Sequence, residues 1–129
     1  MIVLDTHIWV WWVHGDARLS PSHRHLLEEH ESNGLGICAI SLWEVAQLVQ
    51  CGRLVLPVKT DEWFQGALAY PGVTVLDLTP RIALESTRLP SPFHTDPADR
   101  MIVATARVFG CPVITADARL REYPHVETP

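Results

Sequence analysis

Several residue types and patterns that define common protein classes are scarce or absent in this chain of 129 residues. Lys59 is the only lysine, and the three cysteines, Cys38, Cys51 and Cys111, form no CxxC pair. Small buried thiols in a reducing cytoplasm are therefore expected, rather than a disulfide framework or a metal site. The apolar start has no basic segment before it and is shorter than the about 20 residues of a membrane span, so we expect a cytoplasmic protein with no membrane partner.

The motifs of several enzyme classes are also missing. The chain has no glycine-rich phosphate loop, no HExxH zinc motif and no GxSxG nucleophile elbow. His23, His25 and His30 are spaced so that a helix turns them to different faces, which indicates solvated side chains rather than zinc ligands. These absences argue against each of the corresponding chemistries.

The composition is that of a globular protein with an acidic surplus. Hydrophobic residues make up 47% of the chain, enough for one domain over residues 1–129 with a single core. Fifteen acidic residues stand against ten basic ones, giving a formal net charge of −5. That balance argues against a broad basic face for nucleic acid, but does not exclude an enzyme that reaches phosphates through a bound metal.

Short apolar runs alternate with helix-capping residues along the chain. The runs predict buried strands over residues 2–4, 35–39, 73–76 and 113–115. Ser-Pro, Thr-Pro and Asp-Pro pairs, together with Ser41 and Thr60, predict helix starts. The helices are expected at residues 21–32, 42–50, 63–69, 80–88 and 97–109. Four strands alternating with helices indicate an α/β fold with a parallel sheet.

Acidic residues fall at the ends of these strands and at the starts of the helices. In an open parallel sheet, ligands bind beyond the carboxyl ends of the strands. The residues concerned are Asp5 after the first strand, Asp117 after the last, Glu44 after the second, and Asp96 and Asp99 at the helix before the last. One arrangement of the fold brings four or five carboxylates to a common point.

Most of these acids also have a purely structural interpretation. Ser41 and Glu44 match a capping box, in which the glutamate bonds back to the serine amide. Asp96 reads as a helix N-cap before a proline, Asp99 as an acid favoured by the helix dipole, and Asp117 as the cap of a short terminal helix.

Asp5 is harder to explain structurally. It interrupts an apolar run, and no lysine or arginine lies nearby in the sequence to pair with it if it is buried. Carboxylates gathered without cations repel one another and raise each other's pKa, and a divalent cation removes that penalty. Oxygen ligands suit Mg²⁺ or Mn²⁺ better than zinc.

Four sequence stretches together resemble one family. They are LDTHIWVWW, ISLWEVAQL followed by GRL, HTDPADRMIVATA, and VITADARL, in this order from residue 1 to about 123. This order and spacing resemble the PIN-domain ribonucleases of the VapC toxin type. The resemblance implies a PIN-like α/β/α sandwich with a parallel sheet of four to five short strands. It also implies a Mg²⁺- or Mn²⁺-dependent endoribonuclease that acts on RNA, is usually a homodimer and is inhibited by a cognate antitoxin.

The family's four acids correspond in order to Asp5, Glu44, Asp99 and Asp117, which the resemblance implies are catalytic residues and metal ligands. Asp96 belongs to the Asp-Pro-x-Asp-Arg form of the third motif and stays open as a ligand or a helix cap. Around the acids, further residues are expected to support the site. They are Thr6 and Thr115 through their hydroxyls, Arg100 through an ion pair with an acid or a phosphate contact, and His7 and His94 by their nearness.

Other classes remain as alternatives. A haloacid-type phosphatase needs an aspartate two residues after the first, where His7 stands, and a receiver-like module needs a lysine after the last strand. A metal-binding or partner-binding scaffold without nuclease activity also remains. The five tryptophans, which could stack on bases, are expected in the core or in a dimer contact. Setting the five candidate acids aside leaves ten acidic against ten basic residues, so the candidate site accounts in number for the whole acidic surplus.

Overall fold

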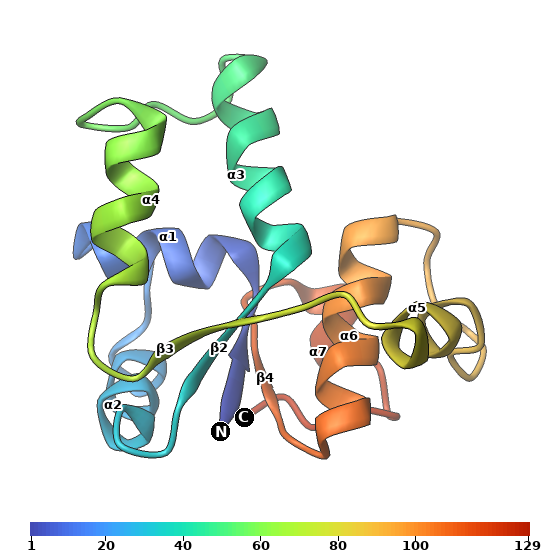
Figure 1. Cartoon of the computed structure of the whole chain (residues 1–129). Coiled ribbons are helices and arrows are strands. Elements are labelled where there is room, and N and C mark those ends of the chain that lie inside the picture. The colour runs from blue at the N-terminus through green and yellow to red at the C-terminus, as the bar shows by residue number, and fades with distance from the viewer.

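A parallel sheet of four short strands forms the centre of the molecule (Figure 1). The computed structural model describes all 129 residues. The sheet order is β3-β2-β1-β4, and every neighbouring pair is parallel. The strands are β1 (Ile2–Leu4), β2 (Leu35–Cys38), β3 (Val73–Leu76) and β4 (Val113–Ile114). The predicted α/β fold with a parallel sheet is confirmed, with four strands.

Seven helices connect and cover the strands. They are α1 (Thr6–His14), α2 (Pro21–His30), α3 (Ala39–Gln50), α4 (Thr60–Leu68), α5 (Pro80–Thr87), α6 (Pro97–Phe109) and α7 (Ala118–Arg121). Ser20, Thr79 and Asp96 each cap a helix that has proline in its first turn, as predicted. None of the helices combines the length and the apolar character needed to cross a membrane.

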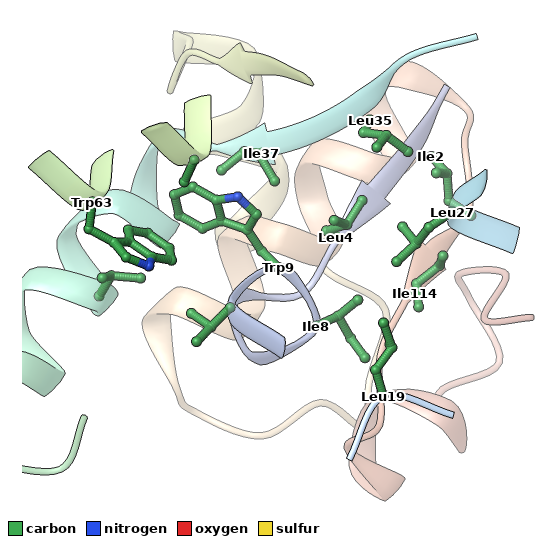
Figure 2. Close-up of a cluster of buried hydrophobic side chains, with 13 residues drawn as sticks. Ile2, Leu4, Ile8, Trp9, Leu19, Leu27, Leu35, Ile37, Trp63 and Ile114 are labelled. Carbon is green, nitrogen blue, oxygen red and sulfur yellow. The ribbon is translucent and has the colours of Figure 1, made fainter. Parts of the chain in front are cut away.

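Both faces of the sheet are buried, because neighbouring residues of a strand point to opposite sides. On one face, Ile2 and Leu4 belong to a cluster of 13 buried side chains that includes residues of α1, α2, α3 and α4 (Figure 2). On the other face, Val3 packs with Ile102 and Ala106 of α6. A third cluster joins α6 to α5 and α7. The layers are therefore helix, sheet and helix, as the family resemblance implies.

The tryptophans divide between core and surface. The rings of Trp9 and Trp63 meet edge to face, 4.9 Å between centroids, within the large cluster (Figure 2). For these two residues the prediction of a core position is confirmed. Trp43, on α3, is 59% exposed and does not belong to the core; its role in a dimer contact stays a prediction.

Helix α1 is the element that the sequence patterns do not indicate. Its run of β-branched and aromatic residues has modest helix propensity and reads locally as a continuing apolar stretch. Asp5 caps the start of the helix, and Gly15 ends it in the left-handed conformation, with φ of 62°. Burial of Ile8 and Trp9 against the sheet stabilises the helix through tertiary packing.

Two predicted helix starts are wrong. Helix α3 begins at Ala39, directly after β2, so Ser41 lies inside the helix and cannot form the predicted capping box with Glu44. In α4, Thr60 is the first helical residue, and the N-cap position belongs to Lys59, which forms no side-chain cap. In both cases the residue that has the side chain typical of a cap lies within the helix.

Two surface assignments also need correction. Cys51 is exposed at the end of α3, because the helix stops there on the outside of the molecule, whereas Cys38 is buried and Cys111 half-buried. All three are free. His23 is buried rather than solvated, with its Nε2 atom 3.0 Å from the carbonyl oxygen of Pro129. His25 is exposed as predicted and lies within ion-pair distance of Glu29 on the same helix.

Gly72 and Gly66 form a matched pair for testing the turn before β3. Gly72 has φ of 83°, and an added Cβ would overlap the backbone carbonyl of Glu31. We expect Gly72→Ala to lower the free energy of unfolding by about 2 kcal/mol or more. Gly66→Ala, in open space within α4, is expected to raise it by up to about 1 kcal/mol. Denaturant titration of both variants measures the difference, and equal stabilities would contradict the assigned turn.

Candidate active site

The five predicted acids line one cavity at the carboxyl edge of the sheet. This cavity, which we call the acid cavity, has a volume of about 360 Å³. Its lining residues are Asp5, His7, Trp11, Glu44, Asp96, Asp99, Ala116, Asp117 and Arg119. The topology explains the convergence, because β1 and β4 are parallel neighbours and both end here. The cavity contains a single arginine and no lysine.

Asp5 lies at the floor of the acid cavity, where β1 turns into α1. Its Oδ1 atom accepts the amide hydrogen of Thr6 at 2.8 Å, and its Oδ2 atom accepts the hydroxyl of Thr115 at 2.6 Å. The side chain of this residue is buried, and no cation contacts it. Burial therefore raises the pKa of Asp5, and the two donated hydrogen bonds oppose that shift.

Glu44 reaches the acid cavity from α3 and is held by Thr6. The Oγ1 atom of Thr6 is 2.5 Å from Oε1 of Glu44 and 2.8 Å from Oγ of Ser41. A hydroxyl has one proton, so Thr6 donates to one of these two oxygens at a time. Burial and the charges of nearby Asp5 and other acids raise the pKa of Glu44 to about 7. Ser41 thus supports the site from inside the helix.

Asp99 and Asp96 come from the first turn of α6. Asp96 caps this helix, since its Oδ1 atom accepts the amide hydrogen of Asp99 at 3.0 Å. Asp99 is only 8% exposed, and its Oδ2 atom lies 2.6 Å from Nε2 of His94. Burial raises the pKa of Asp99, against the effect of this hydrogen bond. Asp96 therefore caps the helix and also faces the cavity.

Asp117 differs from the other acids because an arginine pairs with it. As predicted, it caps α7, accepting the amide hydrogen of Arg119 at 2.9 Å. The guanidinium of Arg119 also donates to both carboxylate oxygens, from Nη2 at 2.9 Å and from Nε at 3.3 Å. These bonds lower the pKa of Asp117. Thr115 links this acid to Asp5, because its hydroxyl oxygen also accepts the amide hydrogen of Asp117.

Two electrostatic environments thus meet in the acid cavity. Asp5, Glu44 and Asp99 are held mainly by neutral donors or histidine, and their pKa values are raised. Asp117 is charge-compensated, and its pKa is lowered. The Nη2 atom of Arg119 lies 3.6 Å from Asp99, a longer contact that does not reverse the shift there. The three carboxylates with raised pKa values therefore form the part of the cavity where a cation would relieve the most repulsion.

Two arginines lie differently from what the sequence analysis predicted. The predicted ion pair between Arg100 and a neighbouring acid is wrong. Arg100 points away from the acids and donates to the carbonyl oxygens of Ser86 and His94 at 3.0 Å. Arg119, which sequence reasoning missed, is the arginine that reaches the cavity. Its signal is the Asp-x-Arg spacing at a helix start, which lets the side chain fold back onto Asp117.

The donor set is compatible with a hard divalent cation. All the acidic ligands offered by the cavity are carboxylate oxygens, which Mg²⁺ and Mn²⁺ prefer. A cation would remove the mutual repulsion that raises three of the pKa values. No three of the histidine, cysteine or acidic side chains are already arranged to share an ion, so binding requires rotamer adjustment or completion by water. Mg²⁺ commonly keeps several waters in such sites.

A parallel sheet with acids gathered at the carboxyl ends of its strands defines an α/β protein with its candidate site in the place usual for such sheets. The sequence matches the model of the PIN domain over residues 2–126. The chain therefore belongs to the PIN-domain family. It is 36% identical over 124 residues to Ribonuclease VapC22 of Mycobacterium tuberculosis (strain ATCC 25618 / H37Rv), covering 96% of this chain and 92% of that protein.

Solved structures share the fold at lower sequence identity. VapBC2 from Rickettsia felis, bound to a promoter DNA fragment, matches with a TM-score of 0.70 and 18% identity, covering 100% of this chain and 98% of that one. DNA-bound VapBC from Salmonella typhimurium matches with a TM-score of 0.71 and 19% identity, covering 99% and 96%. These similarities establish the fold.

The raised pKa of Glu44 predicts how the stability of the metal-free protein depends on pH. The folded-state pKa of about 7 exceeds the ordinary value of 4.5, so the folded state holds more protons between these limits. The contribution of protonated Glu44 to the free energy of unfolding is fully present below pH 4.5, and it is lost as the pH rises through about 7. With a chelator present, we expect Glu44→Gln to melt with a weaker pH dependence than the wild type over this range.

The matched control is Glu28→Gln, an exposed acid on α2. This variant should keep the wild-type pH dependence of the melting temperature. Identical profiles for all three proteins between pH 4.5 and pH 7 would contradict the environment assigned to Glu44.

Proposed function

We propose that this chain is a metal-dependent endoribonuclease of the VapC type, the toxin of a toxin–antitoxin pair. The observation that carries the proposal is the convergence on one cavity of Asp5, Glu44 and Asp99, three carboxylates whose pKa values are raised. Its similarity to a VapC ribonuclease over nearly the whole chain supports the choice of RNA as substrate. The active unit is a single domain over residues 1–129.

In the proposed site, Asp5, Glu44 and Asp99 hold Mg²⁺ or Mn²⁺, and Asp96 completes the ligand set or remains a cap. When bound, such a cation offsets phosphate charge and lowers the pKa of a water nucleophile. Thr115 and Thr6 orient the carboxylates by donating hydrogen bonds to Asp5 and Glu44.

Of Glu44 and Asp117, the contacts favour Glu44 as the acceptor of the proton from water. Both oxygens of Asp117 are engaged by Arg119, and the pKa of this acid is lowered, so it binds a proton weakly. The pKa of Glu44 is raised to about 7 in the metal-free protein, and a cation bound directly to this carboxylate would lower it, so Glu44 acts as proton acceptor in the form of the site in which Asp5 and Asp99 hold the cation. Asp117 instead holds the arginine at the edge of the acid cavity.

Asp5→Asn tests the proposed chemistry. It keeps the size of the side chain and its ability to accept the amide hydrogen of Thr6, but removes the charge of the most buried acid. We expect Mg²⁺-dependent cleavage of RNA to fall about a hundredfold or more, since the lost charge stabilisation amounts to several kcal/mol. The measurement is the initial cleavage rate of a labelled RNA with Mg²⁺, with Mn²⁺ and with a chelator.

Asp77→Asn is the matched control, because Asp77 also follows a strand but is exposed and does not line the acid cavity. Its cleavage rate should equal that of the wild type. Equal rates for wild type and Asp5→Asn, or cleavage unaffected by the chelator, would overturn the assignment.

The proposed partners are RNA, a cognate antitoxin and a second copy of the chain, in the cytoplasm. Three free cysteines fit a reducing compartment, and the exposed side chains of Trp43 and Phe109 suit a protein contact. The bridge from Arg119 to Asp117 and Asp99 shows how a guanidinium can occupy this cavity. An antitoxin arginine inserted among the acids would block the site in the same way.

Growth of a bacterial host tests the toxin role separately. Induced expression of the wild-type chain alone should arrest growth, and expression of Asp5→Asn at the same level should not, because the growth defect requires RNA cleavage. Asp77→Asn should be as toxic as the wild type. Normal growth with soluble wild-type protein would contradict the toxin role and leave the cleavage assay to judge the nuclease.

A further inference from the structure

A second cavity lies beside the acid cavity and shares a residue with it. This flanking cavity has a volume of about 510 Å³. Its lining residues are Pro92, Phe93, His94, Arg119, Glu122, Tyr123 and Pro124. Arg119 lines both cavities, and His94, which lines the flanking cavity, contacts Asp99 in the acid cavity. The two spaces are therefore neighbours along one path.

Arg119 stands at this boundary with donors to spare. Its Nε and Nη2 atoms bond Asp117, which fixes the plane of the guanidinium. No hydrogen bond in the structure uses its Nη1 atom, and the side chain is 59% exposed. A guanidinium has five N–H donors in a fixed fork, so Nη1 can donate to a phosphate oxygen while the pair with Asp117 remains intact.

The walls of the flanking cavity are flat, apolar and firmly held. The ring of Phe93 stacks on that of His94, with 4.5 Å between centroids and 18° between planes. Tyr123 meets Phe93 edge to face at 4.7 Å and is anchored by its hydroxyl, which donates to the carbonyl oxygen of Pro90. Two prolines complete these walls, and Glu122 is the only acid among the lining residues. Tyr123 is buried and one face of Phe93 lies on His94, so a base or sugar would pack on the accessible part of the Phe93 ring and on the two prolines.

We propose that the flanking cavity binds the nucleotide next to the scissile phosphodiester of a single-stranded RNA, with Nη1 of Arg119 donating to its phosphate. The inference rests on the proposed ribonuclease function and extends it by naming a substrate subsite. Charge complementarity favours RNA as the occupant, since Arg119 lines both cavities and its Nη1 atom is a cationic donor that a phosphate can engage. Arg119 is then a substrate-positioning residue, and Asp117 acts through it.

Binding of a labelled single-stranded RNA oligonucleotide tests the role of Arg119. Affinities are measured with Mg²⁺ in proteins that also carry Asp5→Asn, because this substitution limits cleavage of the oligonucleotide during the assay. We expect Arg119→Met to weaken binding about tenfold, the scale of one charge-assisted hydrogen bond. The slope of log K against log salt concentration should become shallower by about 0.7, the effect of one phosphate contact to a single strand. Arg119→Lys should keep most of that slope.

Arg121→Met is the matched control. It removes the same charge from an exposed arginine on α7 that lines neither cavity. We expect it to leave affinity and salt slope close to those of the parent protein. In the otherwise wild-type enzyme, Arg119→Met should raise KM more than it lowers kcat, as expected for a residue that positions substrate.

The base is tested without changing the protein, by moving one abasic residue along the oligonucleotide. At one position the affinity should fall about tenfold, consistent with the loss of a stacked base. Equal affinities at every position, or Arg119→Met indistinguishable from Arg121→Met, would overturn the subsite. So would a loss confined to antitoxin binding, which would make a protein side chain the occupant.

These failures are distinguishable from failure of the proposed function. If the wild type cleaves RNA while the Arg119 variants and the abasic series show no effect, only the subsite is wrong. If the wild type neither cleaves nor binds RNA, the proposed function is wrong, and the subsite falls with it.

Discussion

The structure around the sheet's carboxyl edge is organised by one electrostatic constraint: several carboxylates, two of them buried, share a small cavity with a single guanidinium. Burial and mutual repulsion raise the pKa of Asp5, Glu44 and Asp99. Asp5 and Glu44 accept hydrogen bonds from neutral donors rather than from cations. These donors are the hydroxyls of Thr6 and Thr115 and the amide at the start of α1. Such donors hold the carboxylates in place without neutralising them, so the mutual repulsion of the acids persists in the metal-free protein.

The same helix starts explain why structural and functional interpretations of these acids are compatible. Asp5 caps α1 and Asp96 caps α6, so each helix directs its positive N-terminal end toward the acid cavity. A capping carboxylate has one oxygen on a backbone amide, which leaves the other oxygen free for a different partner. Asp5 uses that second oxygen to accept a hydrogen bond from Thr115, whereas the second oxygen of Asp96 accepts no hydrogen bond from the protein. A sequence match to a capping motif therefore does not argue against a ligand role.

How far the sequence alone predicts the molecule depends on whether the determining contact is local. The strands, the Pro-containing helix starts and the positions of the acids follow from short patterns, and the structure places all five acids together. Helix α1 does not follow, because its stability comes from packing Ile8 and Trp9 on the sheet. The contact of Arg119 with Asp99 joins residues twenty positions apart on different helices, so no local pattern reveals it.

The acidic surplus of the whole chain now has a location and a consequence. The five acids of the acid cavity equal the net charge of −5 in number, and Arg119 is the one full cation that lines the cavity beside them. Because Asp117 occupies two of its donor atoms, this arginine lowers one pKa and leaves the other three raised. Under the proposed function, catalysis and inhibition both depend on the excess negative charge of the acid cavity. A divalent cation makes the cavity approachable for a phosphate, whereas a partner's guanidinium satisfies the acids and leaves no site for either. Nη1 of Arg119 has no hydrogen-bond partner in the protein. Under the proposed subsite, a phosphate of the RNA strand would bind this atom without displacing the cation or breaking the pair with Asp117.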